Sequence, residues 1–538
     1  MAELMKLVEC LGDHPATRIT TWGRMGLVSH SFAQLQQDVR EKVGWLRRRG
    51  LGECMRVGVL AANSYEWLVL DLALVSLRCE IVTLTAAQLE GDLERFAAEQ
   101  ELAVLFFLGH ATPVSRSVHL GWVVAADSRE PIPLRGGGAP GAGRGWTTPF
   151  RVFSSGSTGT PRCISVPRSG LEQVIDELRD TYSFDSSDTV LMFLPVSNLQ
   201  QRFLVYSALW YGISFVLVEP VHLLPALKRT RPTVLLAPPL FFETIARRVT
   251  RSAPLRWLMR VMARLPPGSA LAGARRRVLA PLRRGVLAEL GGQMRLMITG
   301  MAPVARTTLE LYAALELPLF EAYGMTECGI IACNTPRATR SGSVGRPAPG
   351  VRIELASDGE IIVHRDVPLT AGYASLGPEA NAETYLGGGR IATGDLGRFD
   401  GDGFLYLLGR KKNVLVLGDG RKLHPELIER ELMGLPFIHQ VALLPEGKTG
   451  LACAVHLSEE GRGSEETARR ELARLVRELA GQELTRVVFS GEPFTPGNGL
   501  LTQNLKLNRR ALRELLSPRG RTSERKGEEA QHVHVSRG

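Results

Sequence analysis

The stretch Phe153-Ser-Ser-Gly-Ser-Thr-Gly-Thr-Pro-Arg162 is the most informative part of this 538-residue chain. Its run of Gly, Ser and Thr lets backbone amides converge on an anion without obstruction from side chains. Four hydroxyls and one guanidinium add further donors, from Ser154, Ser155, Ser157, Thr158 and Arg162. The segment lacks the Gly-x-x-x-x-Gly-Lys-[Ser/Thr] spacing of a Walker A loop. Taken alone, it suits a phosphate-binding loop and a polar turn equally well.

Four polar stretches downstream also offer groups that suit a nucleotide. The segment Glu321-Ala-Tyr-Gly-Met-Thr-Glu327 contains an aromatic face for a base, a hydroxyl for a phosphate and a hard oxygen ligand for Mg²⁺. The segment Ala392-Thr-Gly-Asp395 ends in a carboxylate that can accept hydrogen bonds from two ribose hydroxyls. The other two are 408–412 and 499–506, and both end in lysine. Each is an ordinary loop by composition, so only the set and its order are informative.

The set and its order resemble the adenylate-forming superfamily of acyl-CoA synthetases, luciferases and adenylation domains. The similarity covers residues 25–515 and is closest to long-chain fatty acyl-CoA synthetases. The family's phosphate loop resembles 154–161, and its adenylate motif resembles Tyr323–Glu327. Further motifs follow in the family's order: Gly345–Gly350, Gly359-Glu360 with Gly372-Tyr373, Thr393–Asp395, the hinge motif at Gly409-Arg410 and the helix start at Pro425–Glu429.

The resemblance implies an α/β fold with two domains, of which the C-terminal one is mobile. Residues 1–409 would form a large N-terminal adenylation domain of several subdomains with mixed sheets and helices. Residues 410–516 would form a small α+β C-terminal domain that swings over it. Residues 517–538 are charged and lack aromatics, which predicts a disordered tail.

Hydrophobic patterns support this organisation independently of the resemblance. Ser31–Arg49 has amphipathic helical spacing, and Arg56–Ala61 and Ala103–Leu108 are strand candidates. Between residues 150 and 330, helical stretches alternate with four apolar runs of strand length, which predicts a largely parallel sheet. These runs are Val190–Leu194, Ile213–Val218, Thr233–Ala237 and Met294–Ile298.

Later segments predict two further units. The strand candidates Glu360–Val363 and Phe404–Leu408 are joined by glycine-rich turns, which indicates an antiparallel unit. After residue 410, Phe437–Leu444 and Leu451–Leu457 read as a hairpin, and Glu465–Leu479 reads as an amphipathic helix.

The resemblance also implies roles for individual residues. Lys506, Thr326 and Glu327 would be catalytic, and Glu327 would bind Mg²⁺. Lys412 would occupy the hinge position between the two half-reactions. The nucleotide would be bound by Ser154, Ser155, Gly156, Ser157, Thr158, Gly159, Arg162, Tyr323, Gly324, Thr326, Asp395 and Arg410.

The expected reaction is the ATP-dependent activation of a medium- or long-chain fatty acid to an acyl adenylate, followed by thioester formation with CoA. Leu236–Glu243, Gly300–Pro303 and Gly499–Lys506 resemble segments of the long-chain branch. ATP, Mg²⁺ and CoA are the expected cofactors and co-substrates. No carrier-domain motif follows Lys506 in this sequence, so the acceptor is expected to come in trans, as CoA or as a separate acyl carrier protein.

Two departures from the family pattern keep alternatives open. The phosphate loop ends in Arg162 where Lys is common, and Asn198 and Gln201 stand where the long-chain branch has His and Glu. The alternatives are an acyl-AMP ligase that delivers the acyl group to a carrier protein or another acceptor, and a degenerate member that binds nucleotide or acyl groups without catalysis. An esterase and a zinc hydrolase are disfavoured, since Gly-x-Ser-x-Gly and His-Glu-x-x-His are both absent from the sequence.

Composition restricts the class of protein further. Apolar residues make up 44% and charged residues 22%, which excludes wholesale disorder. Seven cysteines without a Cys-x-x-Cys pair indicate reduced thiols rather than a zinc ribbon. No signal peptide and no apolar run of spanning length is evident, so a cytoplasmic location is expected.

The positive charge is concentrated in one segment. Arg247–Arg284 contains eleven arginines and no acidic residue, and subtracting these from the net charge of +10 leaves −1 on the rest. This distribution argues against nucleic-acid binding. Cationic and apolar residues mix on helical spacing within the segment, so it is a candidate for peripheral contact with an anionic membrane.

Overall fold

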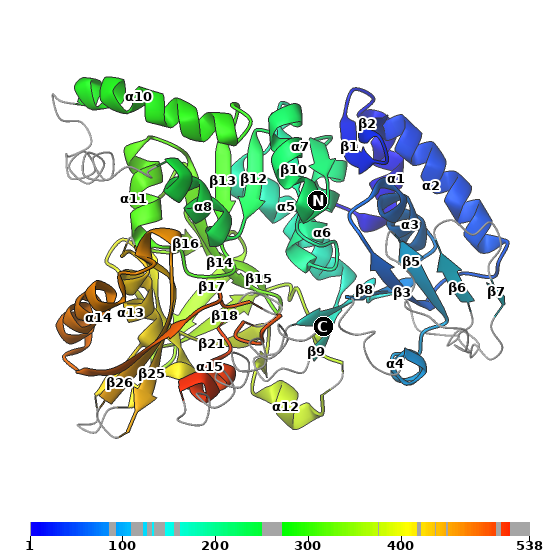
Figure 1. Cartoon of the computed structure of the whole chain (residues 1–538). Helices are drawn as coiled ribbons and strands as arrows, with labels where there is room; N and C mark the ends of the chain where they lie inside the picture. Colours follow the sequence, from blue (N-terminus) through cyan, green and yellow to red (C-terminus); the bar gives the residue numbers. More distant parts are fainter. Residues whose placement is uncertain are drawn as a thin grey trace, which may run out of the picture.

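The computed structural model confirms the α/β class, with several mixed sheets and covering helices (Figure 1). It describes residues 2–85, 93–108, 122–125, 132–133, 146–154, 162–249, 272–374, 376–416, 421–435, 437–447, 450–495, 497–501 and 507–516.

The largest sheet has nine strands in the order β16-β15-β14-β13-β12-β10-β11-β1-β2. From β11 through β10, β12 and β13 to β14, neighbouring strands are parallel, so the predicted parallel sheet is confirmed. Its strands are β1 (Arg18–Gly23), β2 (Gly26–Ser31), β10 (Thr189–Met192), β11 (Ser214–Leu217), β12 (Val234–Ala237), β13 (Leu296–Thr299), β14 (Leu319–Met325), β15 (Gly329–Cys333) and β16 (Arg346–Pro347). The helices along this part of the chain are α5 (Arg168–Tyr182), α6 (Leu199–Trp210), η4 (Pro220–His222), α7 (Leu223–Thr230), α8 (Pro239–Val249), α10 (Ala272–Glu289) and α11 (Arg306–Ala314).

A second sheet has eight strands in the order β19-β9-β8-β4-β3-β5-β6-β7. They are β3 (Arg56–Ala61), β4 (Glu80–Thr83), β5 (Val104–Leu108), β6 (Trp122–Ala125), β7 (Ile132–Pro133), β8 (Phe150–Ser154), β9 (Arg162–Val166) and β19 (Gly372–Tyr373). The helices in the first hundred residues of the chain are η1 (Leu4–Lys6), α1 (Leu7–Cys10), η2 (Leu11–Asp13), α2 (Phe32–Arg47), α3 (Tyr65–Ser76) and α4 (Leu93–Glu99). The predicted strands at 56–61 and 103–108 are therefore confirmed as β3 and β5.

The predicted helix at 31–49 is confirmed as α2, and its local chemistry explains its limits. Ser31 is the N-cap, and its hydroxyl accepts a hydrogen bond from the backbone N–H of Gln34 at 3.1 Å. The buried side chains of Phe32, Leu35 and Val39 recur at helical spacing and face the core.

The third sheet is antiparallel, as the sequence predicts for residues 360–408. Its order is β17-β18-β21-β20, with β22 paired to β21. The elements are β17 (Val351–Leu355), β18 (Glu360–Arg365), α12 (Pro378–Ala382), β20 (Tyr385–Gly387), β21 (Arg390–Phe399) and β22 (Leu405–Arg410).

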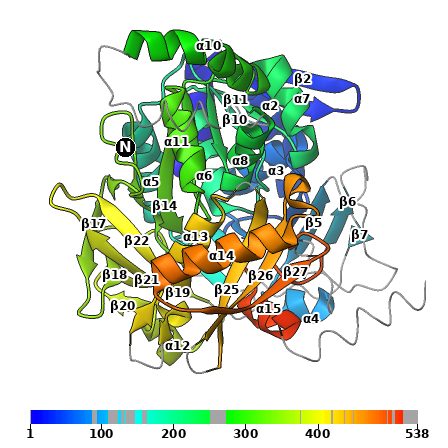
Figure 2. The ribbon, with the colours of Figure 1, turned by 60° about the vertical axis from the view of Figure 1, so that its left-hand side comes forward.

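The chain after β22 packs as a smaller unit with a core of its own (Figure 2). The predicted hairpin is β25 paired with β26, and the predicted helix is α14, whose buried side chains recur every four residues. The unit comprises η5 (Lys411–Asn413), β23 (Leu415–Val416), β24 (Lys422–Leu423), α13 (Pro425–Leu432), β25 (Ile438–Glu446), β26 (Gly450–Leu457), η6 (Glu459–Gly461), α14 (Glu465–Ala480), β27 (Leu484–Ser490) and α15 (Arg509–Leu516). We call it the small domain, and the rest of the described chain the large domain.

Two further findings bear on the sequence predictions. Within the described ranges, no helix is long and apolar enough to cross a bilayer. All seven cysteines are free thiols, which agrees with the sequence analysis. The predicted tail, 517–538, lies outside the described residues.

Candidate nucleotide site

Strand β14 carries the predicted adenylate motif from the parallel sheet into a hairpin. It is parallel to β13 on one side and antiparallel to β15 on the other, with a register shift at Tyr323/Gly324. At Gly324 a Cβ atom would lie 2.3 Å from the carbonyl oxygen of Gly329, so the close approach of the two strands requires glycine. The turn of this hairpin holds Thr326 and Glu327.

Tyr323, Asp395 and Arg410 come together although they are far apart in the sequence. The hydroxyl of Tyr323 donates to Oδ2 of Asp395 at 2.6 Å, and Nε of Arg410 lies 2.7 Å from Oδ1. Asp395 on β21 stands opposite Arg410 on β22 in the sheet register. The structure thus brings three of the predicted nucleotide-binding residues into direct contact.

The surroundings of Asp395 fix its orientation. Its backbone N–H donates to Oγ1 of Thr393 at 3.0 Å, and Thr393 in turn donates to the carbonyl of Ile361 at 2.8 Å. Burial and the carboxylate of Asp395 raise the pKa of Tyr323 well above its usual value, so Tyr323 remains a donor.

Glu327 belongs to a second cluster, with Tyr373 and Arg162. The hydroxyl of Tyr373 donates to Oε1 of Glu327 at 2.8 Å, and Thr370 donates to the backbone carbonyl of Glu327. The guanidinium carbon of Arg162 lies 5.1 Å from the centre of the Tyr373 ring, within cation–π range. Burial, and then the carboxylate of Glu327, raises the pKa of Tyr373 to about 12.

Sheet pairing explains why Arg162 lies beside the adenylate motif. Strands β9 and β19 are antiparallel neighbours with Tyr373 opposite Ile164, and β9 also pairs with β8, where Ser154 stands opposite Arg162. Ser154 and Arg162 stand at the two ends of the predicted phosphate loop. They therefore face each other close to the point where Tyr373 pairs with β9. Residues from all three sheets of the large domain meet at Glu327 and Asp395.

Several predicted site residues lie outside the described part of the chain. These are Ser155, Gly156, Ser157, Thr158, Gly159, Lys506 and the side chain of Ser154. Thr326 lies in the described hairpin turn and is half-buried, and its side chain forms no hydrogen bond with another described residue. Among the described residues, no three His, Cys, Asp or Glu side chains group together as ready-made metal ligands.

Other residues of the site carry contacts that motif reading did not assign. Tyr373, Thr370, Thr393 and Glu360 hold Glu327 or the turn before Asp395 in place. The sequence shows Glu360 and Tyr373 within recognisable motifs, but their partners are 34 and 46 residues away. For Thr393 the sequence does hold a local signal, because a Thr hydroxyl can accept a hydrogen bond from the backbone N–H two residues later, here that of Asp395.

The departure at Asn198 has a structural role. Asn198 is the N-cap of α6, and its Oδ1 accepts from the backbone N–H groups of Gln200 and Gln201 at 2.9 and 3.3 Å. Two positions after Gln200, Arg202 is buried and paired with Asp71. Asn198 thus fixes the start of a buried helix.

Comparisons with known proteins agree with this geometry. A family described as AMP-binding enzyme matches residues 9–373. The long-chain-fatty-acid–CoA ligase FadD15 of Mycobacterium bovis is 26% identical over 469 residues, which cover 80% of this chain and 77% of that protein. Long-chain-fatty-acid–CoA ligase 1 of Homo sapiens is 28% identical over 422 residues, which cover 67% of this chain and 58% of that protein.

Solved structures show the same fold at lower identity. ATP-bound MatB from Rhodopseudomonas palustris has a TM-score of 0.70 at 21% identity, covering 96% of this chain and 99% of that one. The anthranilate CoA ligase AuaEII, in complex with anthranoyl-AMP, has a TM-score of 0.72 at 18% identity, covering 94% and 96%.

The Tyr373–Glu327 contact generates a stability prediction. Tyr373→Phe removes the donor to a carboxylate that is only 7% exposed, which should lower the free energy of unfolding by about 1–3 kcal/mol. Urea unfolding measures this. The control is Tyr406→Phe, whose hydroxyl donates at 3.2 Å to Asp400 in a more open position. An equal loss in both variants would contradict the importance of the contact.

A pH prediction comes from Glu321, which opens the adenylate motif. Burial raises the pKa of Glu321 to about 7 from 4.5, although Arg430 of the small domain opposes the shift. Between these values the folded state binds more protons than the unfolded state, so this group lowers stability as pH rises. Glu321→Gln should therefore lose less stability than the native protein between pH 5 and about 7.

Urea unfolding at several pH values tests this, with Glu310→Gln on the surface of α11 as the control. Parallel stability–pH curves for native protein and Glu321→Gln would refute the assignment.

Proposed function

Because this chain belongs to the AMP-binding enzyme family, we propose that it activates a carboxylic acid with ATP and passes the acyl group to the thiol of CoA. The observation that supports this most is the meeting of two clusters at one hairpin. Tyr323, Asp395 and Arg410 offer an aromatic face, a hydroxyl acceptor and a cation. Glu327 and Arg162 offer a carboxylate and a second cation beside the ends of the predicted phosphate loop.

In the first step, a carboxylate oxygen of the acid attacks the α-phosphorus of ATP. The bond from that phosphorus to the bridging oxygen breaks, and pyrophosphate leaves with the bond's electron pair. Negative charge gathers on the phosphoryl oxygens, so the amides of the phosphate loop, Arg162 and Lys506 would stabilise the transition state through placement and charge. Asp395 would hold the ribose hydroxyls, and Tyr323 would lie against the base.

Mg²⁺ fits the residues present. This ion is commonly bound by one or two carboxylates together with substrate phosphates, and Glu327 is the carboxylate that borders the phosphate-loop ends. The ion would neutralise charge on the phosphates. Tyr373, which donates to Oε1 of Glu327, would orient the carboxylate.

In the second step, the thiolate of CoA attacks the carbonyl carbon of the acyl adenylate. The bond from that carbon to the phosphate oxygen breaks, AMP leaves, and the thiol proton passes to solvent. Because water destroys the adenylate, exclusion of water by the small domain would protect the intermediate.

We propose a medium- or long-chain fatty acid as the acid. The support is the likeness of Leu236–Glu243, Gly300–Pro303 and Gly499–Lys506 to the long-chain branch, together with relatives that carry that name. An acyl-AMP ligase that supplies a separate carrier protein is the second candidate, and the departures at Asn198 and Arg162 keep a non-catalytic binder as the third.

Exchange of labelled pyrophosphate into ATP, measured across an acid panel with and without CoA, tests the function. Medium- or long-chain fatty acids should support exchange, and CoA should convert the adenylate to a thioester. Lys506→Ala should lose about 10²–10³ in rate. Asp395→Ala should weaken ATP binding, whereas Asp366→Ala, in an exposed ion pair with Arg352, should match the native protein.

Each outcome points to one candidate. Exchange with amino acids or acetate but with no fatty acid would overturn the acid class, and unchanged exchange in Lys506→Ala would overturn its role. Acyl-AMP that persists with CoA present would favour the acyl-AMP ligase. ATP binding without exchange for any acid would favour the non-catalytic binder.

We also propose that one face of the large domain contacts an anionic membrane. Of the predicted segment Arg247–Arg284, this face includes the part in α10, and residues 250–271 lie outside the described residues. Hairpin β1–β2, α7 and α10 lie along this face, at the upper edge of Figure 1. The rings of Trp22 and His222 stack at 4.3 Å, and Lys228 of α7 lies 3.9 Å from Glu289 of α10. These contacts join the three elements into one surface, which we call the basic face.

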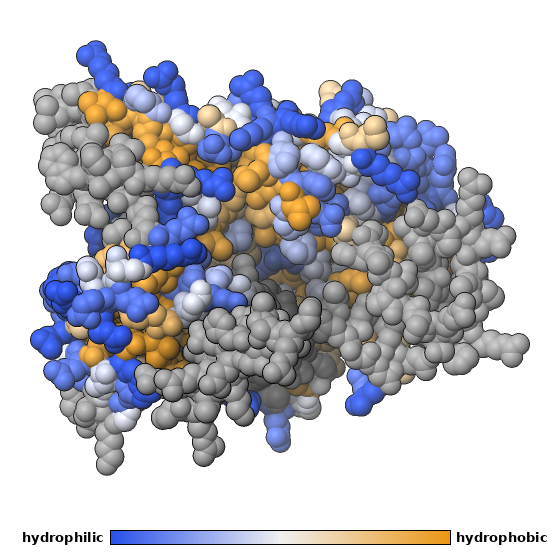
Figure 3. All heavy atoms as spheres, in the orientation of Figure 1, coloured by the Kyte–Doolittle hydropathy of each residue, from blue (hydrophilic) through white to orange (hydrophobic). Residues whose placement is uncertain are grey.

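Exposed apolar side chains and arginines mix on the basic face. Met25 at the hairpin tip is fully exposed, Val221 is 77% exposed and Val278 is 51% exposed. Residues 18–31, 220–231 and 276–288 contain no acidic residue. In Figure 3, hydrophilic side chains project along this edge around hydrophobic ones. Cations with protruding apolar groups suit anionic lipid headgroups over an apolar layer.

Co-sedimentation with vesicles tests the basic face. Vesicles of phosphatidylcholine with phosphatidylserine should bind the protein, and pure phosphatidylcholine should not. Because each basic residue contributes about 1 kcal/mol, Arg277→Glu with Arg283→Glu should weaken binding at least about thirtyfold.

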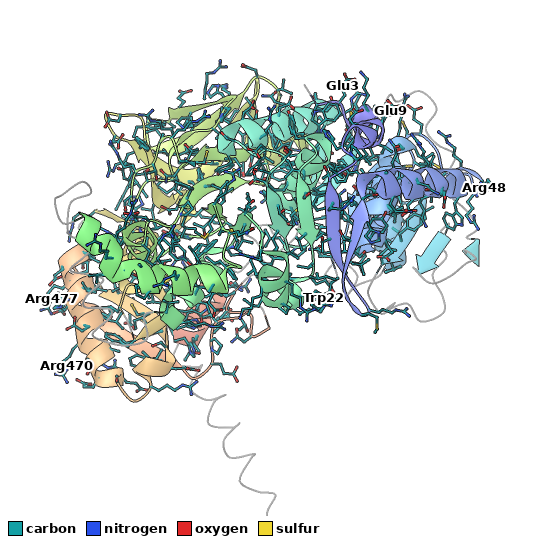
Figure 4. The ribbon with its side chains drawn as sticks, turned by 90° about the horizontal axis from the view of Figure 1, so that it is seen from above. Glu3, Glu9, Trp22, Arg48, Arg470 and Arg477 are labelled. Atoms are coloured by element: carbon teal, nitrogen blue, oxygen red, sulfur yellow. The ribbon has the colours of Figure 1, made fainter. Side chains whose placement is uncertain are left out.

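The matched control is Arg470→Glu with Arg477→Glu on α14, far from Trp22 in the view from above (Figure 4). This variant should bind as the native protein does. Equal binding to neutral vesicles, or equal loss in both double variants, would rule out the basic face as the membrane contact.

A further inference from the structure

The chain leaves the large domain through η5, and its first residue is anchored there. Nζ of Lys411 lies 2.6 Å from Oδ2 of Asp358 and 2.7 Å from Oε2 of Glu360. Both carboxylates belong to the start of β18 or the turn before it, and the side chain of Glu360 is only 13% exposed. The two carboxylates raise the pKa of Lys411, so it remains a cation. The side chain of Lys411, the first residue of the small domain, is thus anchored to the large domain.

Two residues later, the chain is held by the small domain. Nδ2 of Asn413 donates to Oε1 of Glu426 on α13 at 2.6 Å, and Nη2 of Arg509 lies 3.3 Å from the same oxygen. Between Lys411 and Asn413 the chain therefore passes from a side-chain anchor on the large domain to one on the small domain.

Glu360 has a second contact that leads to the nucleotide site. Its other oxygen, Oε1, accepts a hydrogen bond from the backbone N–H of Gly394 at 2.9 Å. Gly394 has a φ of +69° and lies between Thr393 and Asp395, in the turn that aims the Asp395 carboxylate. One nearly buried carboxylate thus contacts both Lys411 and this turn.

We propose that Glu360 is a positioning residue that couples the hinge, through Lys411, to the turn that holds Asp395. The coupling rests on the proposed function, in which Asp395 binds the ribose of ATP. If the anchor of Lys411 is lost, the carboxylate of Glu360 loses one of its two fixed partners and the Gly394 turn is held less firmly. A change at the hinge would then be felt as weaker ATP binding.

A double-mutant cycle on ATP affinity tests the coupling, with ATP titrated calorimetrically in the absence of any acid. Lys411→Met should weaken ATP binding about three- to tenfold in the native background and leave it nearly unchanged in the Glu360→Gln background. Glu360→Gln keeps an acceptor for Gly394 and removes the charge that attracts Lys411. Lys411→Arg keeps the cation and should restore most of the affinity.

The control is Arg352→Met, which breaks an exposed ion pair with Asp366 between strands of the same sheet and should leave ATP affinity unchanged. Additive effects of Lys411→Met and Glu360→Gln would overturn the coupling, as would a Lys411→Met variant that binds ATP like the native protein. A native protein that binds no ATP would instead overturn the proposed function, so the two failures are distinguishable.

Discussion

The carboxylate of Asp395 is the constraint on which the site depends. Tyr323 holds one of its oxygens and Arg410 lies against the other, and the two partners come from different sheets. Only 7% of Asp395 is exposed, so the carboxylate would be costly to bury without both partners. The contact therefore fixes the antiparallel sheet of β21 and β22 against β14 of the largest sheet. The hairpin turn with Glu327 and the end of β9 with Arg162 lie around this junction.

Local pattern predicted the elements whose burial is regular. In α14, buried side chains recur every four residues, and β3 and β12 are short apolar runs. Both patterns can be recognised from residues that are close together in the sequence. The hairpin of β1 and β2 was not predicted, because β2 has no fully buried residue and hence no alternation to detect. Its turn is marked only by Gly26, which has a φ of +116°.

The residues of the site also fall into those that the sequence predicted and those that it did not. Motif order predicted Tyr323, Asp395 and Arg410, and the structure brings them into contact. The partners of Glu327 could not be predicted, since Tyr373 reaches it only through the pairing of β19 with β9, a contact between strands more than 200 residues apart. Similarly, Asn198 reads as the loss of a histidine in the sequence, whereas in the fold it caps α6. Sequence shows which chemical groups are present, and long-range pairing decides which of them meet.

The small domain has a separate apolar core, and the chain passes to it between two anchored residues. A body attached in this way can turn as a unit without unpacking its interior. A change in the orientation of the small domain would then require new dihedral angles at very few backbone bonds. Rotation about a few backbone bonds is fast. Surface contacts between the two domains, such as the approach of Gly434 to Thr307 of α11, would then decide which orientation is kept, rather than the backbone that joins the two domains. The atom of Thr307 that lies there is a methyl carbon, and such a contact has no hydrogen bond to break.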